Sequence, residues 1–167
     1  MRPALDPLTW LPNQDLFRAR LEQILAAAEP PRVALLHLDL DRFGDVNDLL
    51  GHEAGDAVLR EAAARIARAS PQRALLGHFG GDDFAALIEA GELAHAARAA
   101  RSLIDACREP FVVDCLSLQL TASVGIALHP GAADGAAALI AHACSALYRA
   151  KVAGRDRCYP GRAAPAR

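Results

Sequence analysis

The sequence lacks several features that would place it in a particular class of protein. It has no run of about 18 apolar residues, so no segment is expected to span a membrane. Residues 1–9 lack a basic start followed by an apolar run, which argues against a secretory signal peptide. Acidic and basic residues nearly balance, at 20 and 18, without a basic stripe. We therefore expect a cytoplasmic chain that contacts neither membrane nor nucleic acid, although a soluble piece of a membrane-anchored protein would show the same pattern.

Cysteine and aromatic residues are also scarce. The four cysteines form no Cys-x-x-Cys pair and have no paired histidines near them, so we expect small buried thiols rather than a zinc site; they are Cys107, Cys115, Cys144 and Cys158. Aromatic residues make up 5% of a chain that is 53% hydrophobic, so Ala, Leu, Val and Ile must build the core. A length of 167 residues fits one domain.

Hydrophobic periodicity predicts an ordered series of helices and strands. Asn13 is placed to cap the first helix, and Gly154 to stop the last one. The predicted helices cover residues 13–28, part of 41–51, 55–69, 92–108 and from Asp134-Gly135 to about 153, and the predicted strands cover 33–40, 74–79, 82–89, 111–113 and 116–128.

This order predicts an α+β fold, a βααββαβ sandwich in which helices cover a largely antiparallel sheet. We place the domain at residues 1–160 and a loose tail at 161–167, where Pro, Ala and Arg dominate. By analogy of fold alone, the plan is that of a nucleotidyl cyclase or a polymerase palm.

Acidic residues interrupt the apolar pattern in two places. Asp39 ends a strand that should be buried, and Asp82 and Asp83 follow two glycines at a hairpin tip. If that strand lies beside the hairpin, the carboxylates converge and suit Mg²⁺, which takes one or two carboxylates plus substrate phosphates. The alternative is that Asp39 caps the next helix and that Asp82 and Asp83 are solvated turn residues.

The glycines and two basic residues also have two interpretations. Gly80 and Gly81 can supply positive φ in the hairpin, or let a ligand approach the backbone closely. Lys151 and Arg155, four residues apart, can interact with the helix dipole, or form one cationic face that holds phosphates. Both alternatives stay open at this level.

Five ordered blocks between Asp6 and Tyr159 resemble the GGDEF family. They read DPLT-x-LPN from Asp6, DLDRF-x-x-x-ND-x-x-GH-x-x-GD from Asp39, GGDDF from Gly80, TASVGIA from Thr121 and ALYRAKVAGR from Ala146. The resemblance implies a diguanylate cyclase, which joins two GTP molecules into cyclic di-GMP and releases pyrophosphate. It also implies that two such domains meet face to face as a homodimer, and that a fused sensor or EAL phosphodiesterase domain controls the meeting.

The resemblance implies a role for each matching residue. Asp39 and Asp82 would hold Mg²⁺ (or Mn²⁺) with help from the Leu40 carbonyl, and the catalytic set would be Asp82, Asp83 and Lys151. The implied substrate contacts are Asn47 and Asp56 to guanine, Gly80 and Gly81 beside the nucleotide, the backbone around Phe43 facing phosphate, and Lys151 and Arg155 on the β- and γ-phosphates.

Four positions depart from the family pattern. Asp83 stands in place of Glu, Gly44 in place of a phosphate-facing Lys, His78 in place of an Arg, and Cys144 in place of an Asp. Two hypotheses therefore remain: a working diguanylate cyclase, or a degenerate domain that binds GTP, or nothing, and regulates a partner.

Overall fold

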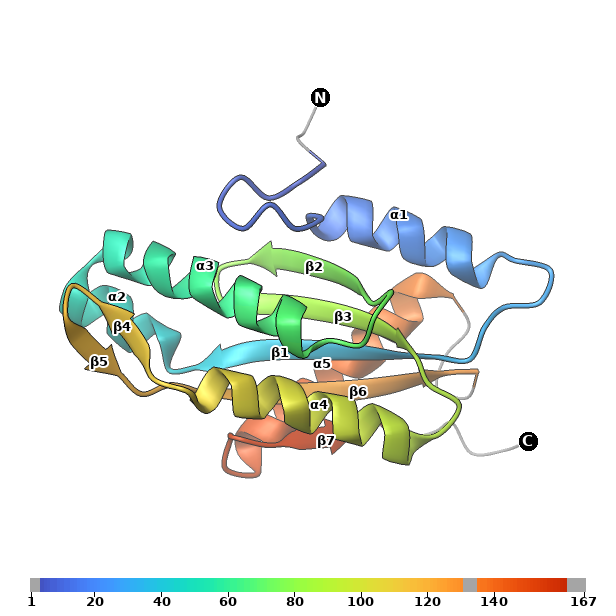
Figure 1. The fold of residues 1–167 in the computed structure, drawn as a ribbon. Helices are drawn as coiled ribbons and strands as arrows, with labels where there is room; N and C mark the ends of the chain where they lie inside the picture. Colours follow the sequence, from blue (N-terminus) through green and yellow to red (C-terminus); the bar gives the residue numbers. More distant parts are fainter. Residues whose placement is uncertain (1–3, 131–134, 162–167) are drawn as a thin grey trace.

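The computed structural model describes residues 4–130 and 135–161, and its centre is a five-stranded mixed sheet of order β2-β3-β1-β6-β7 (Figure 1). β1 (Val33–Asp41) is the middle strand and pairs antiparallel with β3 (Asp83–Glu89) and β6 (Thr121–His129). β2 (Leu75–Gly80) pairs antiparallel with β3 at one edge, and β7 (Cys158–Pro160) pairs parallel with β6 at the other. The predicted α+β fold is confirmed.

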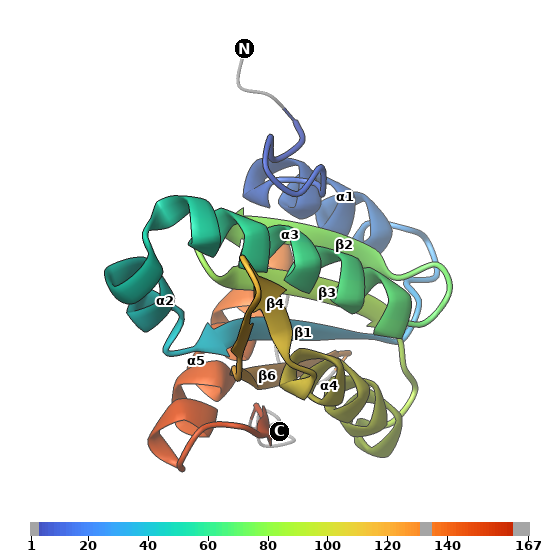
Figure 2. The same cartoon turned by 60° about the vertical axis from the view of Figure 1, so that its left-hand side comes forward.

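Helices cover both faces of this sheet. α3 (His52–Ala69) and α4 (Leu93–Arg108) lie on one face, and α5 (Ala136–Val152) lies on the other, with α1 (Gln14–Leu25) beside β2 (Figure 1). α2 (Phe43–Leu50) leaves the end of β1 and leads into α3 (Figure 2). In the described part of the chain, no helix has the length and apolar character that crossing a bilayer requires.

The side chains of β1 alternate between two apolar clusters. The even-numbered residues from Ala34 to Leu40 face α3 and α4, whereas Val33 and Leu35 face α1 and α5. Beyond Leu35, the face toward α5 becomes polar, with His37, Asp39 and Asp41, although every residue of β1 is buried. Buried polar side chains such as these need hydrogen-bond or ion-pair partners.

The structure corrects several predicted boundaries. The segment 116–128 is two strands, because β5 (Leu116–Leu118) pairs only with β4 (Phe111–Val113) in a separate ribbon and β6 starts at Thr121. α3 begins at His52 rather than at residue 55, after Gly51 at φ +86°. α1 is capped by Asn13 as predicted, with the side chain accepting from the Leu16 N–H at 2.9 Å, but ends at Leu25.

Two more expectations concern the cysteines and the chain end. All four thiols are free, and Cys107 is buried as expected, but Cys115 and Cys144 are exposed, because one lies in the β4–β5 turn and the other on the outer side of α5. β7 was not predicted, since three residues show no periodicity. Of the predicted tail, only Gly161 is described, and its N–H donates to the Ile126 carbonyl at 2.6 Å.

Candidate functional site

Three carboxylates gather where β1 ends and β3 begins, beside the β2–β3 turn. Asp39 pairs with Asp83 in the β1–β3 register, and the Asp82 carbonyl accepts from the Leu40 N–H at 3.3 Å. Lys151 reaches from α5 and places Nζ 2.8 Å from Asp39 Oδ1. The structure thus brings together the acidic residues of two segments that lie about forty positions apart, because β1 lies directly beside β3.

The surroundings of Asp39 and Asp82 disfavour the negative charge of both carboxylates. The Asp39 side chain is only 10% exposed, and burial raises its pKa to about 6; the ion pair with Lys151 opposes this rise, while the charges of Asp82 and Asp83 add to it. Burial also raises the pKa of Asp82, with the charge of Asp83 acting in the same direction. One lysine therefore compensates the negative charge only in part, which favours a further cation.

Asp82 sits next to a turn that needs glycine. Gly80 has φ +105° and Gly81 has φ +54°, so both occupy conformations that side chains with a Cβ rarely adopt. No heavy atom lies within 4 Å of the position that a Cβ would take on either glycine. The glycines therefore serve the backbone of the hairpin and also leave open space above it.

Asn47 and Asp56 lie on the two helices that follow β1. Asn47 is on α2, and its Oδ1 occupies the position that a Cβ on residue 55 would take. The absence of a side chain at Gly55 therefore leaves room for the Asn47 amide beside the first turn of α3. Asp56 is the next residue of α3, and both polar side chains are half-buried. Phe43 is only 6% exposed and packs in the core, so only its backbone is available to a ligand.

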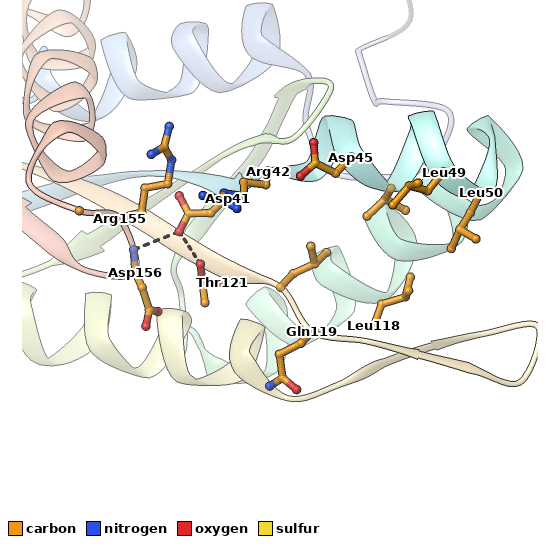
Figure 3. A pocket seen from close by; sticks show the side chains of 13 residues that line it. Asp41, Arg42, Asp45, Leu49, Leu50, Leu118, Gln119, Thr121, Arg155 and Asp156 are labelled. Carbon is orange, nitrogen blue, oxygen red and sulfur yellow. Dashed lines mark hydrogen bonds between the residues drawn. The ribbon is translucent and has the colours of Figure 1, made fainter.

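Lys151 and Arg155 do not share a helical face. α5 ends at Val152, and Arg155 follows Gly154 in a left-handed conformation with φ +63°. Lys151 points to Asp39, whereas Arg155 is exposed at the rim of a neighbouring cavity (Figure 3). Their spacing of four therefore does not reflect helical periodicity.

That cavity has a volume of about 540 Å³ and lies beside the carboxylate cluster. It is bounded by the end of β1, by α2, by the segment before β6 and by the loop after α5 (Figure 3). Arg42, Arg155 and Asp156 on its wall all have positive φ, at 57°, 63° and 49°. None of Asp39, Asp82 and Lys151 lines it, so it adjoins the predicted site without containing it.

Asp41 is a buried acid that sequence reasoning did not assign. Its carboxylate accepts from Thr121 Oγ1 at 2.7 Å and from the Asp156 N–H at 3.0 Å (Figure 3), and also from Ser123 Oγ at 2.8 Å. These bonds satisfy the charge with protein donors and fix the loop that carries Arg155 against β1. Asp41 is therefore a structural acid, in contrast to Asp39.

Two histidines near the cluster were also missed as contributors. His37 Nε2 lies 3.3 Å from Asp83 Oδ1, and the His37 ring packs edge-on to Phe79. His78, in β2, contacts Asp6 and the turn carbonyl of Gly81. The alternation of His37, Asp39 and Asp41 in an otherwise apolar strand is the one sequence signal that pointed to a polar face.

Within residues 4–130 and 135–161, no three His, Cys, Asp or Glu side chains are grouped so that they could hold a metal ion. A divalent cation at the cluster would therefore depend on at most two carboxylates, with backbone carbonyl or ligand oxygens for the rest. Mg²⁺ accepts such a mixed oxygen set.

The sequence and the fold are similar to those of known proteins. The family model described as "Diguanylate cyclase, GGDEF domain" matches residues 3–157. The bifunctional diguanylate cyclase/cyclic di-GMP phosphodiesterase MucR of Pseudomonas aeruginosa is 40% identical over 153 residues, which are 90% of this chain and 22% of MucR. The cyclic di-GMP phosphodiesterase PdeR of Escherichia coli is 33% identical over 152 residues, 91% of this chain and 23% of PdeR.

A solved structure is also similar over nearly the whole chain. The isolated GGDEF domain of TpbB (YfiN) from Pseudomonas aeruginosa superposes with a TM-score of 0.90 at 37% identity, covering 95% of this chain and 94% of that one. This chain spans about a fifth of the length of MucR and PdeR, so these relatives contain long regions with no counterpart here.

Proposed function

The chain belongs to the GGDEF diguanylate cyclase family, and on that premise we propose that it condenses two GTP molecules into cyclic di-GMP and pyrophosphate. The observation that carries the proposal is the convergence beside Lys151 of the buried Asp39 and the half-buried Asp82, two carboxylates of raised pKa. Protein interiors keep such groups together only where something compensates their charge. The metal ion of a bound metal–triphosphate would supply the compensating positive charge.

The donor set fits Mg²⁺ or Mn²⁺ with Asp39, Asp82 and the Leu40 carbonyl as the protein ligands. All three offer oxygen atoms, which Mg²⁺ prefers as ligands. The hydrogen bond from the Leu40 N–H to the Asp82 carbonyl already holds these two residues side by side. When bound, the cation would neutralise phosphate charge and favour loss of the proton from the attacking 3′-hydroxyl. Lys151 would then divide its charge between Asp39 and the phosphates.

The remaining predicted residues would position the nucleotide. Asn47 and Asp56 lie on adjacent helices and offer an amide and a carboxylate to the Watson–Crick edge of guanine. The open backbone at Gly80 and Gly81 leaves room for the nucleotide, and the N–H groups at the start of α2, around Phe43, would face phosphate oxygens. Arg155 would contribute its charge from the adjoining loop.

We further propose that catalysis needs a homodimer, because each domain holds one GTP and supplies half of the reacting pair. The chain's short span relative to MucR supports fusion to sensor or phosphodiesterase domains in the whole protein, which would control the encounter of two copies. We propose a cytoplasmic site of action, where GTP is available.

The second candidate function is a GTP-binding regulator without cyclase activity. Asp83, at the catalytic position that the family fills with Glu, lies 3.3 Å from the buried His37 Nε2. A side chain one methylene shorter and held by a histidine reaches less far toward a substrate. The similarity to PdeR, which is a phosphodiesterase, also favours this alternative.

The deciding experiment incubates the chain, fused to a dimeric coiled coil, with GTP and Mg²⁺, and measures cyclic di-GMP by mass spectrometry and GTP binding by calorimetry. Product that disappears in Asp82→Ala and persists in Asp114→Asn, an exposed matched control, supports the cyclase. GTP binding without product selects the regulator. Failure to bind GTP at any Mg²⁺ concentration refutes both.

A further inference from the structure

His78 is a buried histidine that joins two segments far apart in sequence. Its side chain is 3% exposed, with Nδ1 2.9 Å from Asp6 Oδ1 and Nε2 2.7 Å from the Gly81 carbonyl oxygen. The Nδ1 contact has the distance of an ion pair, although its geometry is not that of a regular hydrogen bond. The ring therefore bridges the N-terminal turn and the glycine turn that leads to Asp82.

Both partners of the ring can only accept hydrogen bonds. A carboxylate and a carbonyl oxygen each need a donor, and a neutral imidazole has only one N–H. The two contacts are therefore favourable together only when both ring nitrogens carry a hydrogen. The ring plane is fixed by stacking on Phe84, with centroids 4.7 Å apart and planes at 22°.

Asp6 is held in place independently of His78. Its Oδ1 accepts from the Leu8 N–H at 3.1 Å, the Thr9 N–H at 2.8 Å and the Thr9 hydroxyl at 2.8 Å. Burial raises the pKa of Asp6, but the contact with His78 and the hydrogen bonds from Thr9 outweigh it and leave the pKa below its ordinary value. The N-terminal turn thus presents a fixed, ionised anchor.

The backbone extends the same connection in both directions. The His78 N–H donates to the Pro12 carbonyl at 2.9 Å, which ties β2 to the end of the N-terminal turn. On the other side, the residue after Gly81 is Asp82, whose carbonyl accepts from the Leu40 N–H. Asp82 is therefore fixed from both sides, by His78 through the turn and by Leu40 in β1.

We propose that His78 is a positioning residue, which holds the glycine turn so that Asp82 stays bonded to Leu40 and beside Asp39, with Asp6 as its anchor. This inference deepens the proposed function and rests on it, because Asp82 matters for catalysis only if the cluster binds a metal nucleotide. His78 itself contacts neither the carboxylates Asp39 and Asp82 nor the predicted guanine site.

The test uses the full 167-residue chain and three variants, His78→Phe, His78→Arg and Asp6→Asn. Phenylalanine keeps the stack on Phe84 but has no donor, whereas arginine offers donors to both acceptors. The readout is amide hydrogen exchange at Leu40, whose N–H reports on the Asp82 carbonyl. We expect exchange to accelerate by roughly tenfold to a hundredfold in His78→Phe and Asp6→Asn, and to stay near wild type in His78→Arg.

Further measurements keep the result interpretable. Exchange at Leu36, in the middle of the sheet, is the control and should change little. In the wild-type chain, the ¹⁵N spectrum of His78 should show a hydrogen on Nε2, the ring nitrogen that contacts the Gly81 carbonyl; an Nε2 without a hydrogen would overturn the proposal even if every variant failed to fold. Unchanged Leu40 exchange in His78→Phe would overturn it as well.

The activity assay separates this proposal from the proposed function. In an active chain, His78→Phe should lower kcat and the affinity for Mg²⁺–GTP, with recovery in His78→Arg. A chain without cyclase activity, but with the exchange pattern above, refutes the proposed function and leaves the positioning of the turn established. Activity that survives in His78→Phe despite faster exchange overturns the link to catalysis.

Discussion

Replacing Asp39 by asparagine should stabilise the metal-free protein while it removes function. The Asp39 carboxylate is buried, and its pKa is raised to about 6 from an ordinary 3.8. At pH 7 the folded protein therefore holds a charge that its surroundings disfavour. An asparagine side chain at this position would have nearly the same shape without the charge.

The magnitude follows from the pKa. A rise from 3.8 to about 6 lowers the free energy of unfolding at pH 7 by about 3 kcal/mol relative to an unperturbed carboxyl. Because the raised pKa already includes the opposing attraction of Lys151, Asp39→Asn removes this cost without a further loss from the broken ion pair. We expect a gain of up to about 3 kcal/mol, which raises Tm by up to about 12 °C.

The pH dependence has a definite sign. Between the two pKa values, the folded state binds the Asp39 proton and the unfolded state does not, so stability falls as pH rises through this window and the loss is complete above about pH 6. Lowering the pH from 7 to 5 should thus recover about 1 kcal/mol in the wild type. The same change of pH should recover none of this free energy in Asp39→Asn, which lacks the carboxyl group.

Urea denaturation in EDTA between pH 5 and 8 measures both effects, with Asp114→Asn as the exposed control. Mg²⁺-dependent GTP binding, measured on the same three proteins without urea or EDTA, should be lost in Asp39→Asn alone. The reasoning is refuted if Asp39→Asn is less stable than the wild type at pH 7 in EDTA, or if both proteins show the same dependence on pH.

Four further substitutions test other parts of the structure. Arg65→Met should lower the free energy of unfolding by about 2–4 kcal/mol in urea titrations, because the buried guanidinium donates to three carbonyl groups at the end of α4; a loss below 1 kcal/mol would contradict this role. Gly125→Ala should cost about 3 kcal/mol, since its Cβ would overlap the Ala143 carbonyl in the backbone of α5, whereas Gly44→Ala, with open space around it, should stabilise α2 by up to about 1 kcal/mol; equal effects at the two glycines would refute the packing argument. Gly44→Lys should tighten Mg²⁺–GTP binding about fivefold in calorimetry by adding a cation at the start of α2, and weaker binding would show that no phosphate lies there.

Much of the fold could be predicted from local patterns. The strands 33–40 and 82–89 and the helix 92–108 follow from continuous or periodic apolar runs, and the structure places β1, β3 and α4 there. The break between β5 and β6 was missed, because apolar and polar residues alternate through it and no glycine or proline stands between residues 116 and 121. β7 was missed because a three-residue strand is defined by its pairing with β6 rather than by its composition.

The candidate site was predictable where single residues contradict their surroundings. Asp39 stands out because it interrupts an apolar strand, and the glycines before Asp82 stand out because a hairpin needs positive φ. The connection from Asp6 through His78 could not be predicted, since it joins residues 72 positions apart by two side-chain contacts.

The sequence by itself determined the order of helices and strands, the family, and which acidic residues were out of place. Only the tertiary structure decided that Asp41 is satisfied by Thr121 and Ser123 while Asp39 has a single lysine. The two acids are identical in type and occupy the same face of β1. What distinguishes them is the donors that β6 and α5 bring to each, and a chain shows those only when its distant segments have packed together.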